Sequence, residues 1–510
     1  MSRVILYLSL ALIILTSCNE NNFHDKNPRC LEDFSKLNDK KYSINDQAVR
    51  EHISRLIKDD GVLISADRQV IRYYAENKPF IWINRLGIHN RADTLLKIIQ
   101  KADLYGFSTR MLKVSQIEKD LNIIRSLNVS DGNDNINIIL ARLEYNLTKA
   151  LLRYSTGLRY GMVNPDYLYN NLEKYEVDST STKFRQLSDL RIERPNNEFY
   201  SKVITQAMND SIVDLFATIL PQNDLYEKLI QHLNRNGLTY EEKVKTICNI
   251  ERCRWRLKIL SGQNKFNKYV EVNIPSFLLR AINNNDILTM RVGCGTTQYK
   301  TPLLTSKITR MDINPQWIIP KSISKGYVGN HQYMHKMGMF VYDKKLGKLP
   351  PEEASYNKVM NGEQYIIQAG GPKNSLGRII FRFNNNFSVF LHDTSSPWLF
   401  QRTNRAVSHG CIRVEKPYEL ALFLLNERNE KLQEKLEYSM TVELVNDNDS
   451  LRKSKIDRSR MINSVSVNPS IPLFVTYYTK YWDENGRLAD YQDIYGYDEV
   501  LYNKLKPFVE

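Results

Sequence analysis

Hydrophobic residues recur at helical spacing through the first half of the chain. Between residues 135 and 156 they fall at steps of three and four: Ile136, Ile139, Leu140, Leu143, Leu147, Ala150, Leu151 and Tyr154. A helix buries such a stripe against a core. Glycine and proline interrupt the pattern at residues 75–83 and 157–169, where we expect turns. The pattern therefore predicts an all-α domain over residues 46–262.

From about residue 268 the hydrophobic period changes to two, which is typical of β-strands. Residues 268–295 predict a hairpin with an Asn-rich turn. Further strands are expected at residues 307–313, 363–369, 377–383 and 386–392. Residues 414–428 return to helical spacing, with Pro417 in the first turn. We therefore predict a multidomain α+β protein, with a mostly β, sandwich-like domain over residues 263–446.

Three segments follow neither period. Residues 18–45 are polar and Asn-rich, as expected of a flexible tether. Residues 321–362 are rich in Lys, Gly and Pro, and their length favours an insertion or lid over a site. Residues 447–510 predict a charged connector and a hairpin that packs on the β domain, with Asn485-Gly486 at the turn.

The 510 residues carry a formal net charge of +14. This excess is mild for the length, and no basic block is interleaved with aromatic residues. We therefore expect no nucleic-acid partner. A positive excess would also suit an anionic wall polymer or an acidic lipid surface.

The chain begins with a short apolar run that predicts a signal peptide over residues 1–17. Arg3 precedes the run from Val4 to Leu15, which is shorter than the roughly 20 residues of a membrane-spanning helix. Leu15-Thr16-Ser17-Cys18 resembles the bacterial lipoprotein box, in which the cysteine receives a lipid. A plain secretory signal is the alternative. We expect a protein of the bacterial cell envelope that is anchored to a membrane through Cys18 and faces the periplasm.

The cysteines show no spacing typical of a metal site, so we expect neither a metal nor a cofactor. Six occur in the chain: Cys18, Cys30, Cys248, Cys253, Cys294 and Cys411. If Cys18 carries lipid, an odd number remains, and at least one thiol is unpaired.

One cysteine stands in a sequence that favours nucleophilic chemistry. Residues 408–414 read Ser-His-Gly-Cys-Ile-Arg-Val, and a predicted strand upstream ends at His392. A thiol becomes a competent nucleophile when an imidazole within reach takes its proton. Gly410 permits a tight turn, so that consecutive N–H groups can converge on an oxyanion. These residues indicate a Cys/His acyl-transfer site, and the alternative is a buried thiol beside a core histidine.

The segment HDTSSPWLFQRTNRAVSHGCIRV, which contains His392 and Cys411, closely resembles the signature of bacterial L,D-transpeptidases with a YkuD-type catalytic domain. The likeness extends over residues 272–282, 301–320, 368–381 and 483–498 and into the helical half. Most of residues 46–505 thus resemble the large, scaffold-bearing subfamily. Only a short stretch, about residues 225–262, occupies the place where larger relatives carry a peptidoglycan-binding module.

The resemblance implies roles for particular residues. Cys411 would be the nucleophile and His392 the general base and then acid, while the N–H groups of Gly410 and Cys411 would form the oxyanion hole. In this family a backbone carbonyl often orients the base, so we expect the carboxylate of Asp393 to be an exposed loop charge. Three further residues would contact substrate: Arg413, Ser408 and His409.

The resemblance also implies a reaction and partners. A tetrapeptide stem of peptidoglycan would donate its acyl group to the cysteine, and a diamino-acid amine of a second stem would accept it, giving a 3→3 crosslink. With water as acceptor, the same site would be an L,D-carboxypeptidase. A carbapenem is expected to be a covalent inhibitor. The alternative outside enzymology is an inactive wall-binding lipoprotein.

Overall fold

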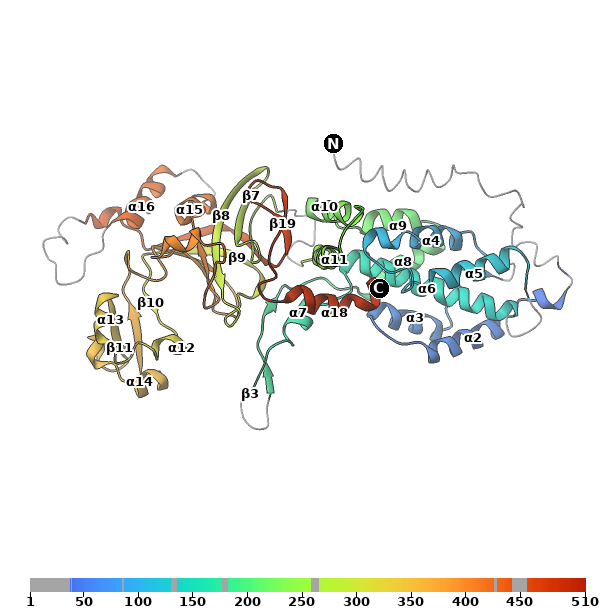
Figure 1. Ribbon diagram of the computed structural model, residues 1–510, viewed down its shortest axis with the longest axis horizontal. Helices are drawn as coiled ribbons and strands as arrows, with labels where there is room; N and C mark the ends of the chain where they lie inside the picture. The colour runs from blue at the N-terminus through green and yellow to red at the C-terminus, as the bar shows by residue number, and fades with distance from the viewer. Residues whose placement is uncertain are drawn as a thin grey trace. The chain divides into compact units, whose positions relative to one another are not determined.

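The computed structural model describes residues 37, 39–84, 87–129, 135–176, 182–257, 266–425, 429–442 and 456–510. The chain forms two compact units (Figure 1). One comprises Met1–Asn164, Ile192–Lys258 and Tyr497–Glu510, and the other comprises Pro165–Arg191 and Ile259–Gly496. Cys18, the signal peptide at residues 1–17 and most of the tether lie outside the described residues. Within the described ranges, no helix has the length and apolar character needed to cross a membrane.

The first unit is helical and is built around one long helix, α6, over Ile136–Tyr160. This helix is buried on almost every side and packs against α2, α3, α4, α5, α8, α9 and α11. The predicted all-α domain is therefore confirmed. Its helices are α2 Asp46–Asp59, α3 Ser65–Ala75, α4 Arg91–Ile99, α5 Val114–Arg125, α6, α8 Asn197–Met208, α9 Ile212–Ile219, α10 Asp224–Leu233, α11 Tyr240–Arg254 and α18 Tyr497–Val509.

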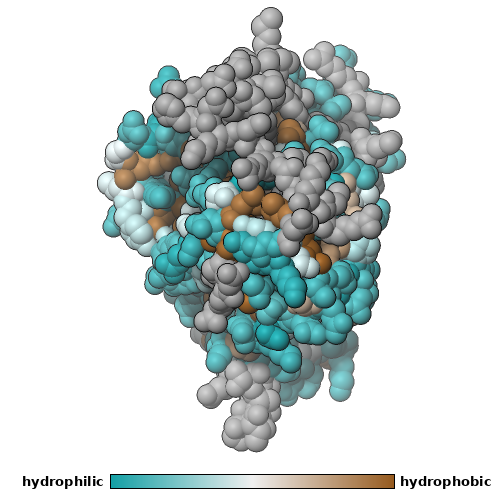
Figure 2. Space-filling model, turned by 90° about the vertical axis from the view of Figure 1, so that its right-hand side faces the viewer, coloured by the Kyte–Doolittle hydropathy of each residue, from teal (hydrophilic) through white to brown (hydrophobic). Residues whose placement is uncertain are grey.

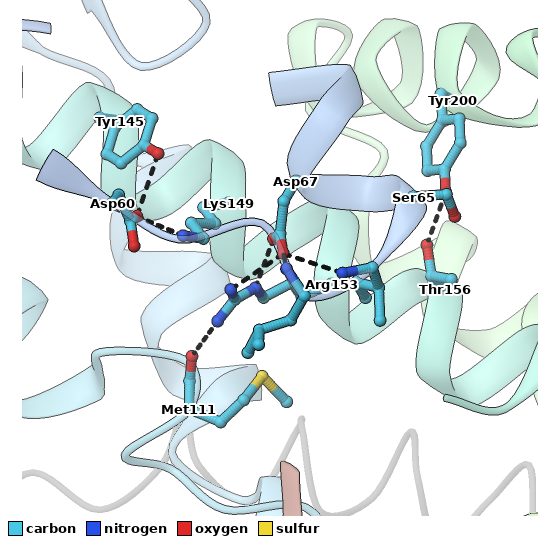
Figure 3. Close-up of polar contacts among 11 residues, drawn as sticks. Asp60, Ser65, Asp67, Met111, Tyr145, Lys149, Arg153, Thr156 and Tyr200 are labelled. Carbon is cyan, nitrogen blue, oxygen red and sulfur yellow. Dashed lines mark hydrogen bonds and ion pairs between the residues drawn. The ribbon is translucent and has the colours of Figure 1, made fainter. Parts of the chain in front are cut away.

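Charged side chains of α6 are buried in pairs. Arg153 binds the carboxylate of Asp67, with Nε to Oδ1 at 2.6 Å and Nη2 to Oδ2 at 3.1 Å, and donates to the Met111 carbonyl (Figure 3). Lys149 likewise binds Asp60. Because an unpaired buried charge would be strongly destabilising, these pairs fix the start of α3 on α6. The surface in Figure 2 is mostly hydrophilic, with hydrophobic residues gathered near its centre.

The second unit contains a sheet that closes on itself. The strand order is β14-β15-β17-β8-β7-β6-β18-β9, and β14 also pairs with β9. The mostly β domain is confirmed, but the sheet is barrel-like because of this last pairing, where the sequence suggested a sandwich. Its strands are β6 Lys268–Asn273, β7 Leu278–Asn283, β8 Asp286–Gly295, β9 Leu303–Ile313, β14 Ile379–Phe383, β15 Leu391–His392, β17 Ile412–Val414 and β18 Ser464–Thr476.

Further elements border the barrel. The predicted helix near Pro417 is α15, Pro417–Leu424, and α16 follows over Glu430–Thr441. The predicted hairpin with Asn485-Gly486 at its turn is formed by β19 Lys480–Trp482 and β20 Leu488–Asp490.

The insertion is a small folded body with a core of its own. Four strands pair in the order β10-β13-β11-β12, and the buried core comprises Ile319, Met334, Met339, Val341, Val359 and Ile366. The lack of a period at residues 321–362 thus reflects very short elements. These are β10 Trp317–Ile318, α12 Lys321–Ser324, α13 His331–Lys336, β11 Met339–Asp343, β12 Gly347–Leu349, α14 Tyr356–Asn361 and β13 Gln364–Gln368.

Two of the predicted boundaries need correction. Pro165–Arg191 was assigned to the helical domain but belongs to the β unit, because β5, Ser188–Asp189, pairs with β9. The last residues were predicted to pack on the β domain. They form α18 of the helical unit instead, where Arg252 makes a buried ion pair with Asp498 at 2.5 Å.

Candidate active site

Cys411 lies in a tight turn between β16, Ala406–Ser408, and β17. Gly410 adopts a φ of +110°, a conformation that strongly favours glycine because it has no Cβ. The turn is attached to the barrel on both sides, since β16 pairs with β8 in parallel and β17 pairs with β8 in antiparallel orientation. The sheet therefore fixes the position of the thiol.

Two buried hydroxyl groups hold this turn. Ser408 Oγ accepts a hydrogen bond from Gly410 N–H at 3.0 Å and donates one to the Cys411 carbonyl at 2.6 Å. Thr301 Oγ1 donates to the Gly410 carbonyl at 2.9 Å and accepts from Gly295 N–H at 2.8 Å. Since Ser408 and Thr301 are both buried, water cannot readily replace these bonds.

These bonds change two of the predicted roles. The N–H of Gly410 was expected in the oxyanion hole, but it is engaged by Ser408. Ser408 was expected to contact substrate, but its hydroxyl is used inside the turn. Among the described residues, the N–H of Cys411 has no hydrogen-bond partner, so it is the predicted donor that remains available for an oxyanion.

The sheet brings His392 next to the turn. Strands β15 and β17 pair in parallel, with Leu391 opposite Ile412 and His392 opposite Arg413. Leu391 and Ile412 are fully buried in the core. Because side chains alternate between the two faces of a strand, His392, Arg413 and Cys411 share the other face. No hydrogen bond between the imidazole and the thiol is present in the described structure.

A backbone carbonyl orients the imidazole of His392. Nδ1 lies 2.5 Å from the carbonyl oxygen of Asp393. A carbonyl oxygen can only accept, so Nδ1 carries the proton, and in the neutral ring the lone pair is on Nε2. This is the tautomer that a general base requires.

Burial keeps both reactive groups neutral. It is the main cause that lowers the pKa of His392 to about 4, and the positive charge of Arg413 lowers it further, while the Asp393 and Leu376 carbonyls act in the opposite direction. Burial also raises the pKa of Cys411, against the opposing influence of the Phe390 N–H and the charge of Arg413. At neutral pH the site therefore holds a thiol and a neutral imidazole.

The carboxylate of Asp393 is not the exposed loop charge that we expected. It is partly buried and accepts hydrogen bonds from Arg378 N–H at 2.8 Å and Thr394 N–H at 2.7 Å. Burial raises its pKa, and these two N–H groups act against that shift. The carboxylate thus holds the backbone on either side of the carbonyl that orients His392.

Arg413 places a partly buried cation on the face that His392 and Cys411 share. Its Nε is buried and has no hydrogen-bond partner, and no ion pair of Arg413 occurs among the described residues. Burial lowers its pKa, and the nearby Cys411 acts in the opposite direction. An unpaired, partly buried guanidinium can bind a carboxylate through two N–H groups.

His409 has a different environment from His392. Its side chain is exposed, and its ring lies 4.5 Å, centroid to centroid, from the ring of Tyr299. This packing leaves His392 as the histidine on the face of Cys411.

Two residues that shape the site, Asn374 and Tyr495, were not among the predicted site residues, although both lie in segments that carry the family likeness. Asn374 is buried, donates to the carbonyls of Pro315 and Ala369 and accepts from Leu376 N–H. It therefore holds the loop whose Leu376 carbonyl faces His392. Tyr495 is the other, since its hydroxyl donates to the Gly295 carbonyl at 2.7 Å behind the nucleophile turn.

Among the described residues, no group of three or more His, Cys, Asp or Glu side chains could hold a metal ion.

Comparison with known proteins identifies two domains in the chain. Residues 267–432 match the family model of the YkuD L,D-transpeptidase catalytic domain, and residues 68–233 match that of a scaffold domain. The chain thus combines a YkuD L,D-transpeptidase catalytic domain with a scaffold domain, which is the architecture of the scaffold-bearing L,D-transpeptidases.

Two individual proteins are similar to parts of the chain. A Haemophilus influenzae protein named "Putative L,D-transpeptidase" is 28% identical over 371 residues, which cover 69% of each chain. A solved structure titled as the Ldtfm-avibactam carbamoyl enzyme covers 55% of this chain and 77% of its own, with 11% identity and a TM-score of 0.20. This second likeness is too low to support any conclusion about fold or function.

Proposed function

We propose that this protein is a peptidoglycan L,D-transpeptidase that forms 3→3 crosslinks through a thioester on Cys411. The observation that carries the proposal is the position of His392. Its Nδ1–H is held by the Asp393 carbonyl, and its strand is paired with the strand that follows Cys411. A base with the required tautomer thus shares a face with the thiol of Cys411.

In the first step, the sulfur of Cys411 attacks the carbonyl carbon of the third residue in a tetrapeptide stem. The thiol proton moves to Nε2 of His392. The N–H of Cys411 donates a hydrogen bond to the oxyanion. Collapse of the tetrahedral intermediate then breaks the C–N bond to the terminal D-alanine. The D-alanine nitrogen takes the proton from His392, and a thioester remains.

In the second step, the amine of a diamino acid in a second stem attacks the thioester carbon. His392 takes a proton from that amine and returns it to the leaving sulfur, so that an amide forms and the thiol is regenerated. Water in place of the amine would release a tripeptide and make the protein an L,D-carboxypeptidase.

Arg413 would bind a carboxylate of the donor stem. Its buried Nε has no hydrogen-bond partner among the described residues, and it lies on the face that His392 and Cys411 share. The same charge lowers the pKa of His392, so a bound carboxylate would relieve that effect and favour proton transfer to Nε2 once the substrate is in place.

The proposed location rests on the first residues of the sequence. We propose that a lipid on Cys18 anchors the protein in the bacterial cell envelope, with the catalytic unit in the periplasm where peptidoglycan is found. Loss of membrane association in Cys18→Ala would support the anchor, and unchanged fractionation would contradict it.

Product analysis tests the function. Purified protein is incubated with a tetrapeptide stem that carries a free side-chain amine, and the products are identified by mass spectrometry. We expect D-alanine and a 3→3 linked dimer. Cys411→Ser should give neither, because a hydroxyl is much harder to ionise beside the same imidazole. Release of D-alanine with tripeptide alone would identify a carboxypeptidase, and no reaction by the folded protein would contradict the proposal.

A further inference from the structure

The β unit carries a hairpin that belongs to neither the barrel nor the insertion. It consists of β3, Lys174–Glu176, and β4, Thr182–Phe184, within the segment that the sequence placed in the helical domain. The base of the hairpin is anchored. Asn170 accepts hydrogen bonds from Leu187 N–H and Ser188 N–H and donates to the Ser188 carbonyl. The following strand, β5, then joins the sheet at β9.

This β3–β4 hairpin is linked to the loop beside the nucleophile turn. Glu173 binds both Lys300 and Arg185, and Arg185 also donates to the Gln298 carbonyl at 2.7 Å. The carbonyl of Lys300 lies 3.6 Å from the position that a Cβ of Gly410 would occupy. The hairpin is therefore fixed next to the backbone that presents Cys411.

The hairpin carries a hollow whose lining includes two cations, Lys174 and Arg185, and one carboxylate, Glu173. The hollow is lined by Glu173, Lys174, Tyr175, Phe184, Arg185 and Gln186. Lys174 is exposed, with its ammonium 5.8 Å from the ring centre of Phe184, and it makes no ion pair with a described residue. Two further cations, Lys300 and Arg185, share the single carboxylate of Glu173. A carboxylate-bearing ligand would match this excess of positive charge.

The reaction needs such a second site. A transpeptidase binds two stem peptides, and the donor is accounted for by the face of His392 and Arg413. The face of His392 and Arg413 lies next to the loop that follows the insertion. Asn374 holds this loop through its hydrogen bond from Leu376 N–H. The hairpin is linked to the turn that carries Cys411 through other residues, since Glu173 binds Lys300 and the Lys300 carbonyl lies near Gly410. In Figure 1 the hairpin and the insertion project from the barrel as two separate arms.

We propose that the hollow of the β3–β4 hairpin binds the acceptor stem peptide. Lys174 binds a carboxylate of that peptide, and the ring of Phe184, which is paired with Lys174 on the same face of the hairpin, contacts the peptide. This inference rests on the proposed function, since it assigns the second substrate of the same reaction. Tyr175 is paired with Lys183, so their side chains lie on the opposite face of the hairpin.

Charge reversal at one face of the hairpin tests the proposal. Lys174→Glu is compared with Lys183→Glu, since Lys183 is also exposed on the hairpin but does not line the hollow. Two rates are measured: D-alanine release from a tetrapeptide whose side-chain amine is acetylated, and crosslinking to a separate amine-bearing acceptor stem at increasing concentration.

We expect Lys174→Glu to raise the acceptor concentration for half-maximal crosslinking about tenfold or more, since the repulsive charge acts on the acceptor alone. D-alanine release should be unchanged, and Lys183→Glu should behave as the unaltered protein. Phe184→Ala should weaken acceptor use in the same selective way, because Phe184 lies beside Lys174. The proposal is overturned if both charge reversals have equal effects, if Lys174→Glu slows D-alanine release as much as crosslinking, or if crosslinking is unaffected. The proposed function itself would fail differently, through absence of D-alanine release in the unaltered protein.

Discussion

Gly377 lies directly against the carboxylate of Asp393, so that a Cβ at Gly377 would be 2.4 Å from the carboxylate carbon. The φ of Gly377 is +65°. This close approach lets Asp393 accept the neighbouring N–H of Arg378 while its own carbonyl orients His392. The geometry of the base therefore depends on a glycine that packs against Asp393.

Gly377→Ala should displace Asp393 and disturb His392. We expect acylation of Cys411 to slow by about tenfold or more, because small misplacements of a catalytic group are costly. The matched control is Gly486→Ala, since Gly486 has a φ of +74° but no atom within 4 Å of a Cβ. It reproduces the backbone strain without the clash. Equal acylation rates in the two variants, followed with a chromogenic carbapenem, would refute the link between Gly377 and His392.

Ser408 is predicted to act on the turn and not on the substrate. Ser408→Ala leaves the buried N–H of Gly410 without its partner, which should lower the free energy of unfolding by about 1–3 kcal/mol. Ser408→Thr keeps the hydroxyl and should lose less. Acylation should slow for substrates of any length, because the position of Cys411 changes. A loss confined to KM for the stem peptide, with unaltered stability in urea, would restore the substrate-contact role.

The resting thiol is predicted to be protonated at neutral pH. The pKa of Cys411 is raised and that of His392 is lowered to about 4. At neutral pH the thiol is therefore protonated and the imidazole is uncharged. Alkylation of Cys411 by iodoacetamide should be slow at pH 6 to 8 and should rise steeply toward alkaline pH. Peptide-level mass spectrometry separates this thiol from Cys253. A fast, pH-independent plateau near pH 6 would instead indicate a thiolate–imidazolium pair.

Arg413 is predicted to contribute to donor binding and to the proton affinity of His392. Arg413→Gln should weaken use of the tetrapeptide about tenfold or more, since a charge-assisted pair with its carboxylate is lost. Because the positive charge lowers the pKa of His392, its removal should raise that pKa. NMR titration of the imidazole reads out this second effect. An unchanged titration together with unchanged kinetics would place Arg413 outside the site.

The helical half and the reactive pair could be predicted because their signals are local. The stripe of α6 repeats over many residues, and the segment around Cys411 is contiguous. Strand β18 shows the limit. It contains Pro469 and Pro472 and a register shift between Ser466 and Ile471, and prolines argue against a central strand. Its partners β6 and β9 lie more than a hundred residues away in the sequence.

The same limit applies within the site. The motif around Cys411 indicated which residues are involved, but it did not show that Ser408 Oγ accepts a hydrogen bond from the N–H of Gly410. That bond depends on the backbone conformation at Gly410 and on Thr301, which arrives from a loop more than a hundred residues upstream. The position of Thr301 beside Gly410 results from contacts between residues far apart in the chain. A single sequence contains no pattern that predicts such contacts.

The most direct test of the account is the intact mass of the protein after brief incubation with a carbapenem or with a tetrapeptide stem. The account predicts one covalent adduct, the whole mass of the carbapenem or the tripeptide acyl group, that maps to Cys411 and is absent in Cys411→Ala. His392→Ala should form the adduct far more slowly while remaining folded. An adduct on another residue, or none on the folded protein, would contradict the central claim.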